Sequence, residues 1–139
     1  MPTQSTFLEV KSVGPGLGQI VNVASVPQRS PFRYPGGKTW LIPTVRKWLL
    51  QDGKATHLIE PFAGGGIVSL TAAFENLARQ ITMIELDEEV AAVWEVALNG
   101  KNKWLANKIT NFDLTIENVK TELEKKHKQI QDIAFCTIL

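Results

Sequence analysis

The sequence contains a single cysteine, Cys136, among its 139 residues. One thiol excludes an internal disulfide and a zinc site built from several cysteines, and it favours a protein of the reducing cytoplasm. The chain also lacks a run of about 18 apolar residues, and its N-terminus lacks the charged and apolar regions of a secretory signal. These absences predict a soluble protein with no membrane partner.

The chain carries almost no net charge. Its formal charge is +1 at pH 7, which gives no overall attraction toward nucleic acid. Any contact with DNA must therefore come from a local patch or from another part of the protein. With 44% hydrophobic and 21% charged residues, the chain is in the globular range and is long enough for one modest core.

The most informative stretch runs from Leu58 to Gly66. An apolar pair is followed by an acid and a proline, then by three consecutive glycines and an apolar segment with helical spacing. This order predicts a strand, a tight turn and a helix. Glycine allows positive φ and lets a ligand approach the backbone, while the unpaired N–H groups of the new helix point toward it. We therefore expect a nucleotide-like ligand here.

The next predicted strand strengthens this interpretation. The glycines do not form the dinucleotide motif G-x-G-x-x-G, because Ser69 stands at its last position, and a glycine cluster alone often marks only a turn. The run 81–85 is rich in β-branched residues and ends in Glu85, about 20 residues beyond the glycines, where a βαβ unit presents an acid to a ribose hydroxyl. The glycine turn and Glu85 together predict one adenosine-binding site.

A second glycine turn lies upstream, at residues 33–39. Gly37-Lys38-Thr39 resembles the end of a P-loop, but Phe32 occupies the position of that motif's first glycine, which excludes an NTPase of this type. What remains is a turn with backbone donors, an aromatic ring at Tyr34 and a cation at Lys38, which suits an adenine ring or a carboxylate. An ordinary surface turn that enters a helix fits the same pattern.

Three further segments have the periodicity of amphipathic helices. We expect the first to have Pro43 in its first turn and to end at Asp52-Gly53. The second begins at Ile67, and the third is capped by Asp87 and ends at Asn99-Gly100. The residues expected to be buried on these helices are Leu41, Val45, Trp48, Leu49, Val68, Leu70, Ala72, Ala73, Phe74, Leu77, Val90, Val93, Trp94 and Ala97.

The N-terminal residues 1–30 carry little information. We expect an extension that is mobile by default, with short strands at 7–10 and 19–26.

Lysines are frequent in residues 101–139, and we interpret them as a solvated helix face rather than a DNA-binding surface. A polar helix capped by Thr115 is expected to run through Ile130, with His127 on the surface. The final run 133–139 is apolar. We expect it to be cut in the middle of an element and left uncovered.

Three ordered motifs in this chain resemble those of a known enzyme family. They are Arg33-Tyr34-Pro35-Gly36-Gly37-Lys38, Glu60-Pro61-Phe62-Ala63-Gly64-Gly65-Gly66 and Ile84-Glu85-Leu86-Asp87. They look like the N-terminal motifs of the Dam-type (D12 class) DNA adenine N6-methyltransferases, and three ordered motifs over about 55 residues are far more specific than one. The resemblance covers Pro31 to about Gly100 and, more faintly, the segment 134–139.

The resemblance implies the α/β class, with an incomplete Rossmann-like S-adenosylmethionine-dependent methyltransferase fold, a three-layer α/β/α sandwich. It implies S-adenosylmethionine as the methyl donor and double-stranded DNA as the partner of the complete enzyme. Residues 31–100 would form the S-adenosylmethionine-binding region, and residues 101–139 the truncated start of a helical target-recognition region.

The resemblance also assigns roles to residues. Lys38 would lie near the methionine carboxylate, and the turn 62–66 would hold the methionine portion of the cofactor against the backbone. Glu85 would accept hydrogen bonds from both ribose hydroxyls, and Asp87 with Leu86 would line the adenine pocket. The full predicted set of cofactor-binding residues is Tyr34, Gly36, Gly37, Lys38, Glu60, Pro61, Phe62, Ala63, Gly64, Gly65, Gly66, Glu85, Leu86 and Asp87.

The family's catalytic motif, Asp-Pro-Pro-Tyr or a close variant, is missing, because the chain has seven prolines and no two are adjacent. That motif holds the amino group of a flipped-out adenine. We therefore predict no catalytic residue, no metal ligand and no DNA methylation by this chain alone. We expect the N-terminal portion of a methyltransferase, of a restriction-modification system or solitary, completed by a missing C-terminal half or a second chain.

Two alternatives stay open at this stage. One is a non-catalytic module that binds S-adenosylmethionine or another adenine nucleotide. The other is an NAD-dependent Rossmann oxidoreductase, which the missing G-x-G-x-x-G motif and the turn at Lys38 both disfavour.

Overall fold

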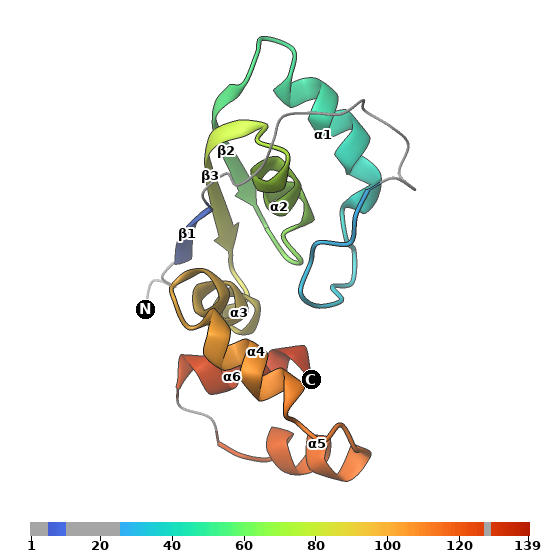
Figure 1. Ribbon diagram of the computed structural model, residues 1–139, viewed down its shortest axis with the longest axis vertical. Helices are drawn as coiled ribbons and strands as arrows, with labels where there is room; N and C mark the ends of the chain where they lie inside the picture. The colour runs from blue at the N-terminus through green and yellow to red at the C-terminus, as the bar shows by residue number, and fades with distance from the viewer. Residues whose placement is uncertain (1–5, 11–25, 127–128) are drawn as a thin grey trace. The chain divides into compact units, whose positions relative to one another are not determined.

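The chain folds as two compact units, Met1–Leu86 and Asp87–Leu139. The computed structural model describes residues 6–10, 26–126 and 129–139, and Figure 1 shows their elements. The elements of the first unit are β1 (Thr6–Val10), the short 3-10 helix η2 (Thr39–Leu41), α1 (Ile42–Leu49), β2 (Ala55–Pro61), α2 (Ile67–Phe74) and β3 (Ala78–Glu85). Those of the second unit are α3 (Glu88–Leu98), α4 (Asn102–Thr110), α5 (Ile116–Leu123) and α6 (Ile130–Ile138).

A three-stranded sheet forms the centre of the first unit. Its order is β1-β3-β2, with β2 and β3 parallel and β1 antiparallel to β3. Helix α2 connects the two parallel strands and contacts both of them, and α1 contacts α2 (Figure 1). Because β2, α2 and β3 form the predicted βαβ unit, the α/β class is confirmed.

Strand β1 comes from the N-terminal extension and pairs with β3, beginning with Thr6 opposite Glu85. The strand predicted at 7–10 is thus confirmed. The strand predicted at 19–26 falls almost entirely outside the described residues. With partners on both sides, β3 is the central strand of the sheet.

Helix α2 presents an almost wholly buried surface. Every residue from 67 to 73 is buried, and Leu77, which follows the helix, is buried as predicted. The prediction that Phe74 is buried is wrong, since its side chain is exposed. The guanidinium of Arg29 lies 5.3 Å from the centre of the Phe74 ring, a cation–π contact that is compatible with a solvent-facing ring.

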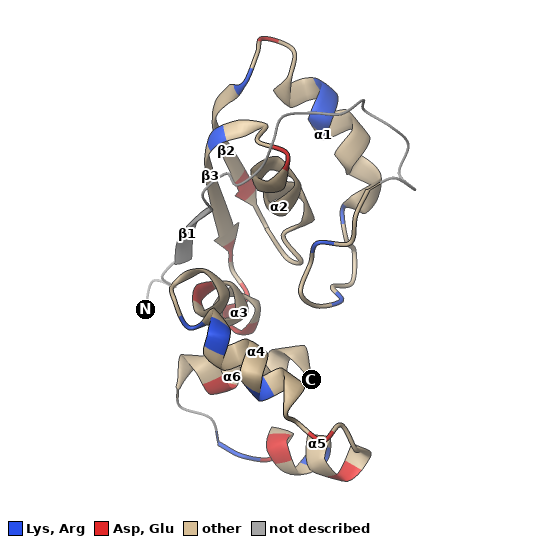
Figure 2. Cartoon of the chain, viewed as in Figure 1, with Lys and Arg blue, Asp and Glu red and all other residues tan. Residues whose placement is uncertain are grey.

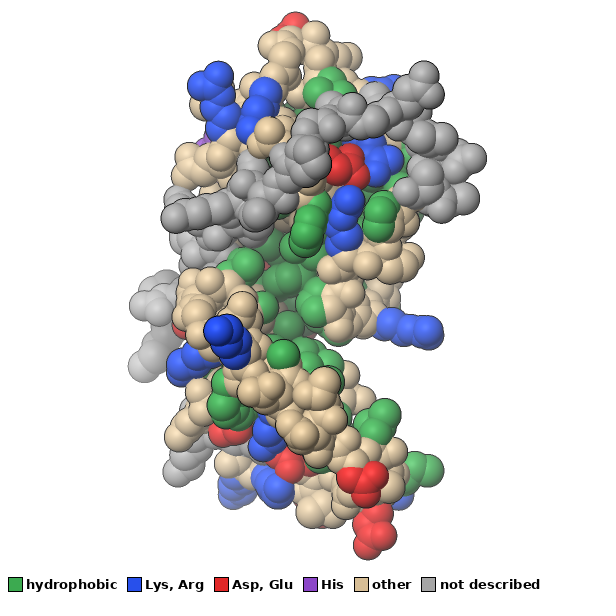
Figure 3. Space-filling model, in the orientation of Figure 1, with side chains coloured by type: hydrophobic (Ala, Val, Ile, Leu, Met, Phe, Trp, Pro, Cys, Tyr) green, Lys and Arg blue, Asp and Glu red, His purple; other side chains and the backbone are tan. Residues whose placement is uncertain are grey.

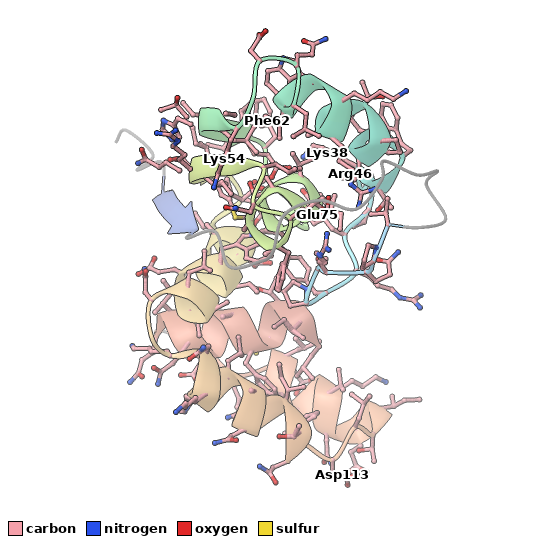
Figure 4. All side chains as sticks on the ribbon, turned by 45° about the horizontal axis from the view of Figure 1, so that its top comes forward. Lys38, Arg46, Lys54, Phe62, Glu75 and Asp113 are labelled. Atoms are coloured by element: carbon pink, nitrogen blue, oxygen red, sulfur yellow. The ribbon has the colours of Figure 1, made fainter. Side chains whose placement is uncertain are left out.

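Helix α1 begins with Pro43 in its first turn, as predicted. The prediction that Trp48 is buried is wrong, because it is 60% exposed, and Leu41 is only partly buried. Arg46 is buried on this helix instead. Its guanidinium donates from Nε to Oε2 of Glu75 at 2.7 Å and from Nη2 to Oε1 at 2.5 Å, and the two side chains point toward each other in Figure 4. The buried face of α1 thus combines Arg46 with the apolar residues Ile42, Val45 and Leu49.

In the second unit, α3 begins where it was predicted. The Asp87 carboxylate accepts from the N–H groups of Glu89 at 2.9 Å and Val90 at 3.2 Å, which satisfies two donors of the first turn. The helix ends at Leu98, and Gly100, two residues later, has a φ of 86°, the conformation expected of a glycine that ends a helix. Trp94 is buried, which supports its interpretation as a packing residue.

The prediction of a single polar helix through Ile130 is wrong. The segment forms two helices, α5 and α6, and α4 precedes them without having been predicted. Thr115 does cap α5, since its hydroxyl accepts from the N–H of Asn118 at 3.2 Å. Residues 124–126, which follow α5, carry no apolar side chain for packing, and a short helix depends on such packing. His127 lies outside the described residues.

The prediction that the apolar run 133–139 is uncovered is also wrong. These residues belong to α6 and the residue after it, and α6 contacts α3 and α4. Ala134 and Phe135 are completely buried. The ring of Phe135 meets that of Phe112 edge-on, with centroids 5.2 Å apart. The tail is therefore part of the core of the second unit.

Charges of both signs are spread over both units (Figure 2), and acidic residues stand among the lysines of the second unit. Apolar side chains also remain visible on the surface of both units (Figure 3). Among the residues that the structure describes, no helix combines the length and apolar character needed to cross a membrane.

Candidate functional site

The candidate site lies where the two parallel strands end. Glu60 is next to the last residue of β2 and Glu85 is the last residue of β3, and parallel pairing brings these ends to the same edge of the sheet. Between β2 and α2 the chain turns with positive φ at Phe62 (57°), Gly64 (51°) and Gly66 (65°). Such a φ is uncommon for phenylalanine, whose side chain here is 71% exposed.

The carboxylate of Glu85 holds this turn against the end of β3. The N–H of Gly64 donates to Oε2 at 2.6 Å, and the N–H of Leu86 donates to Oε1 at 2.8 Å. Glu85 is only 6% exposed. In the structure, the acid that the sequence predicted as a ligand contact ties the glycine turn to the end of the neighbouring strand.

The ring of Tyr34 lies directly on Gly64. A Cβ atom on Gly64 would stand 2.6 Å from Cε1 of Tyr34, and one on Gly65 would stand 3.0 Å from Oγ of Ser30. No side chain fits at the first position while the ring stays there. The sequence explained these glycines by the approach of a ligand, whereas the structure shows the protein's own Tyr34 and Ser30 against them.

A series of hydrogen bonds connects the two glycine turns. Lys38 donates from Nζ to the carbonyl oxygen of Phe62 at 2.5 Å and to Oε1 of Glu60 at 3.3 Å, and Figure 4 shows Lys38 and Phe62 in this region. Ser69, in the first turn of α2, donates from both its N–H and its Oγ to Oε2 of Glu60. The sequence carried no signal for Ser69, because its partner lies nine positions earlier on another element.

A cavity of about 720 Å³ opens between the two turns. The predicted residues that line it are Tyr34, Gly36, Gly37, Lys38, Ala63, Gly65 and Gly66. Lining residues that the sequence did not predict are Gln28, Ser30, Pro31, Phe32, Arg33, Thr39 and Ile67. Most of the lining residues that the sequence did not predict precede Tyr34. That stretch has no glycine and no helical or strand periodicity that would indicate a binding site.

The other predicted residues lie outside this lining. Glu60, Gly64 and Glu85 form the hydrogen-bonded support next to it. Phe62 and Leu86 are exposed, and Pro61 is the last residue of β2. Asp87 belongs to the second unit, where its carboxylate caps α3.

Arg29, which lies between the cavity-lining residues Gln28 and Ser30, takes part in an ion cluster with Arg46 and Glu75. Arg29 donates from Nη1 to Oε1 of Glu75 at 2.9 Å, and Arg46 of α1 binds the same carboxylate. Glu75 follows the last residue of α2. This one carboxylate therefore links α1, α2 and the segment next to Gln28.

The contact between Tyr34 and Gly64 leads to a stability prediction. Gly64→Ala adds a methyl group that displaces the ring and also strains a backbone at positive φ, so we expect the free energy of unfolding to fall by about 2 to 3 kcal/mol. Gly36→Ala is the matched control, because its φ of 77° is also positive but no atom lies within 4 Å of its Cβ position. It should cost only about 1 kcal/mol. Urea unfolding followed by circular dichroism measures the free energy of unfolding of both variants. Equal losses in the two variants would contradict the explanation by steric contact with Tyr34.

Within the described residues, no group of three or more histidine, cysteine or acidic side chains is arranged to hold a metal ion. Burial raises the pKa of the Cys136 thiol, and the nearby charges of Glu122 and Asp132 raise it further against the opposing effect of Lys108 and Lys125. The thiol therefore stays protonated and weakly nucleophilic near neutral pH.

Comparison with known proteins gave one family. The model of the family described as D12 class N6 adenine-specific DNA methyltransferase matches residues 34–137, which span both units and begin at Tyr34. The curated proteins and the solved structures contain no match to the chain.

Proposed function

Because the chain belongs to the D12 class of N6 adenine-specific DNA methyltransferases, we propose that its cavity between the two glycine turns binds S-adenosylmethionine. The membership confirms the resemblance that the three sequence motifs predicted. In this proposal the chain is the cofactor-binding, N-terminal portion of a site-specific DNA adenine N6-methyltransferase that acts on double-stranded DNA. Its incomplete sheet would belong to a three-layer α/β/α sandwich.

The observation that carries the proposal is the convergence of Tyr34, Lys38 and the turn 62–66. These groups come from two sequence motifs more than 20 residues apart. The cavity volume of about 720 Å³ falls within the roughly 300 to 1,000 Å³ usual for small-molecule sites. Ile67, the first residue of α2, also lines the cavity beside the glycines, and a backbone N–H at the start of a helix is a suitable donor for a polar ligand.

Each portion of S-adenosylmethionine has a chemically suitable partner. Within the first unit, we assign the methionine carboxylate to Lys38 and the ribose hydroxyls to Glu85, with Leu86 toward the adenine. When bound, the cofactor supplies a methyl group on a positively charged sulfur, which makes that methyl group electrophilic.

We propose that this chain does not methylate DNA by itself. Its seven prolines include no adjacent pair, so the Asp-Pro-Pro-Tyr motif that accepts hydrogens from the target amino group would come from a further segment or a second chain. The proposed setting is the cytoplasm, where DNA is accessible and a lone thiol such as Cys136 stays reduced. A restriction-modification system is one such context.

Calorimetric titration of the 139-residue protein with S-adenosylmethionine, NAD and ATP tests the proposal. We expect saturable binding of S-adenosylmethionine and none of NAD or ATP. Tighter binding of ATP would favour the alternative, a non-catalytic adenine-nucleotide module, and binding of NAD alone would favour an oxidoreductase. Transfer of a labelled methyl group to DNA by the protein alone would contradict the proposed need for a second segment.

A further inference from the structure

A buried serine on α2 takes part in the site without touching the cavity. Ser69 is completely buried, and Glu60, which accepts its hydrogen bonds, is only 4% exposed. We propose that Ser69 is a positioning residue of the cofactor site, which fixes the carboxylate of Glu60 and through it holds the ammonium of Lys38 at the cavity. This inference rests on the proposed function, because it concerns the part of the cofactor that Lys38 would bind.

The two oxygens of Glu60 have separate partners. Oε2 accepts from the N–H of Ser69 at 2.9 Å and from its Oγ at 2.6 Å, whereas Oε1 accepts from Nζ of Lys38 at 3.3 Å. Because both donors of Ser69 bind one oxygen, they fix the plane of the carboxylate and direct the other oxygen toward Lys38. Without the hydroxyl, a single N–H leaves the carboxylate free to rotate about its last bond.

Of the three residues Ser69, Glu60 and Lys38, only Lys38 lines the cavity. An ammonium has three donors, and two of them bind Glu60 and the carbonyl oxygen of Phe62. The side chain also lines the cavity, where the third donor can bind an anionic group. The Phe62 contact additionally ties the ammonium to the glycine turn, so the orientation of Glu60 affects both the cation and the turn.

A neighbouring residue supplies a matched control. Thr71 lies on the same helix and is also buried, but its hydroxyl has no hydrogen-bond partner among the described residues. Thr71→Val removes a buried hydroxyl from α2 without breaking a bond to Glu60. Any effect of Ser69→Ala that Thr71→Val lacks is therefore specific to the bond with Glu60.

The test compares two ligands on the full 139-residue chain. S-adenosylmethionine carries the methionine carboxylate, whereas 5′-methylthioadenosine lacks it and keeps the adenine, the ribose and the sulfur. We expect Ser69→Ala to weaken S-adenosylmethionine binding about tenfold, or about 1.4 kcal/mol, and to leave the affinity for 5′-methylthioadenosine unchanged. Glu60→Gln should give the same pattern, and Thr71→Val should change neither affinity.

Equal losses for both ligands, or no loss for either, would overturn the positioning role. Failure of the parent protein to bind either ligand would overturn the proposed function itself. In that case acylation of Lys38 by an amine-reactive ester, read by peptide mass spectrometry on the ligand-free protein, still decides the inference. Faster acylation in Ser69→Ala than in Thr71→Val supports positioning of Lys38, and equal rates overturn it.

Discussion

Replacing Glu75 with alanine is expected to lower the free energy of unfolding by about 3 kcal/mol. Its carboxylate is the shared acceptor of Arg46 and Arg29, and Arg46 is buried. Once the carboxylate is gone, the guanidinium of Arg46 is a buried charge without its bidentate partner, which is more costly than losing an exposed ion pair. Urea unfolding followed by circular dichroism measures the change.

Three further variants, Asp52→Ala, Arg46→Met and the double variant of Glu75 and Arg46, identify the cause of that loss. Asp52→Ala removes an exposed acid from the same unit and should change the stability by less than about 0.5 kcal/mol. Combining Glu75→Ala with Arg46→Met removes the unpaired charge and should recover part of the lost stability. A double variant as unstable as the sum of the two single variants would argue against the buried-charge explanation.

The same cluster predicts a pH dependence. Burial pushes the pKa of Glu75 upward, but hydrogen bonds and positive charge from Arg46 and Arg29 outweigh it and hold that pKa below its ordinary value. A carboxyl group with a lowered pKa in the folded state contributes stability above its ordinary pKa, and this contribution is lost as the pH falls through the lowered value. The stability difference between the parent and Glu75→Gln should therefore narrow on acidification. A difference that stays constant would show that the charge of Glu75 does not contribute.

The second large effect is expected on binding. In the proposed cofactor site, Glu85→Ala should weaken S-adenosylmethionine binding by about 2 kcal/mol, or about 30-fold, because hydrogen bonds to a charged acceptor contribute about 1.5 to 3 kcal/mol. The variant also loses the acceptor of the Gly64 N–H, so the titration is done at a temperature at which its circular dichroism spectrum matches that of the parent.

A pair of ligands separates the ribose contact from the support of the turn. The parent should bind 5′-methylthioadenosine more tightly than its 2′,3′-dideoxy analogue, and Glu85→Ala should bind the two equally. If the variant keeps the parent's preference for the hydroxylated ligand, Glu85 acts only through the backbone N–H groups of Gly64 and Leu86 that it binds. The site assignment would then move to another acceptor.

The sequence by itself determined the features that depend on neighbouring residues. The βαβ unit followed from an apolar run, three glycines and a second β-branched run, and the caps at Asp87 and Thr115 followed from the bonds that short polar side chains make to the next turn. The order of three motifs identified the family. Each cap and turn depends on a few neighbouring residues, and the order of the motifs is itself a property of the sequence, so these features could be predicted without knowing which distant residues meet.

Only the tertiary structure decided which residues far apart in the sequence meet. Position 64 requires a glycine because the ring of Tyr34 lies against it. Ser69 supports the site because its hydroxyl donates to Glu60. Arg46 is buried while Trp48 is exposed, because Arg46 lies on the buried face of α1 with Ile42, Val45 and Leu49 and pairs there with Glu75. Hydrogen bonds, charge pairs and close contacts have energies set by distance in space, and the spacing of residues along one helix or strand does not contain that information.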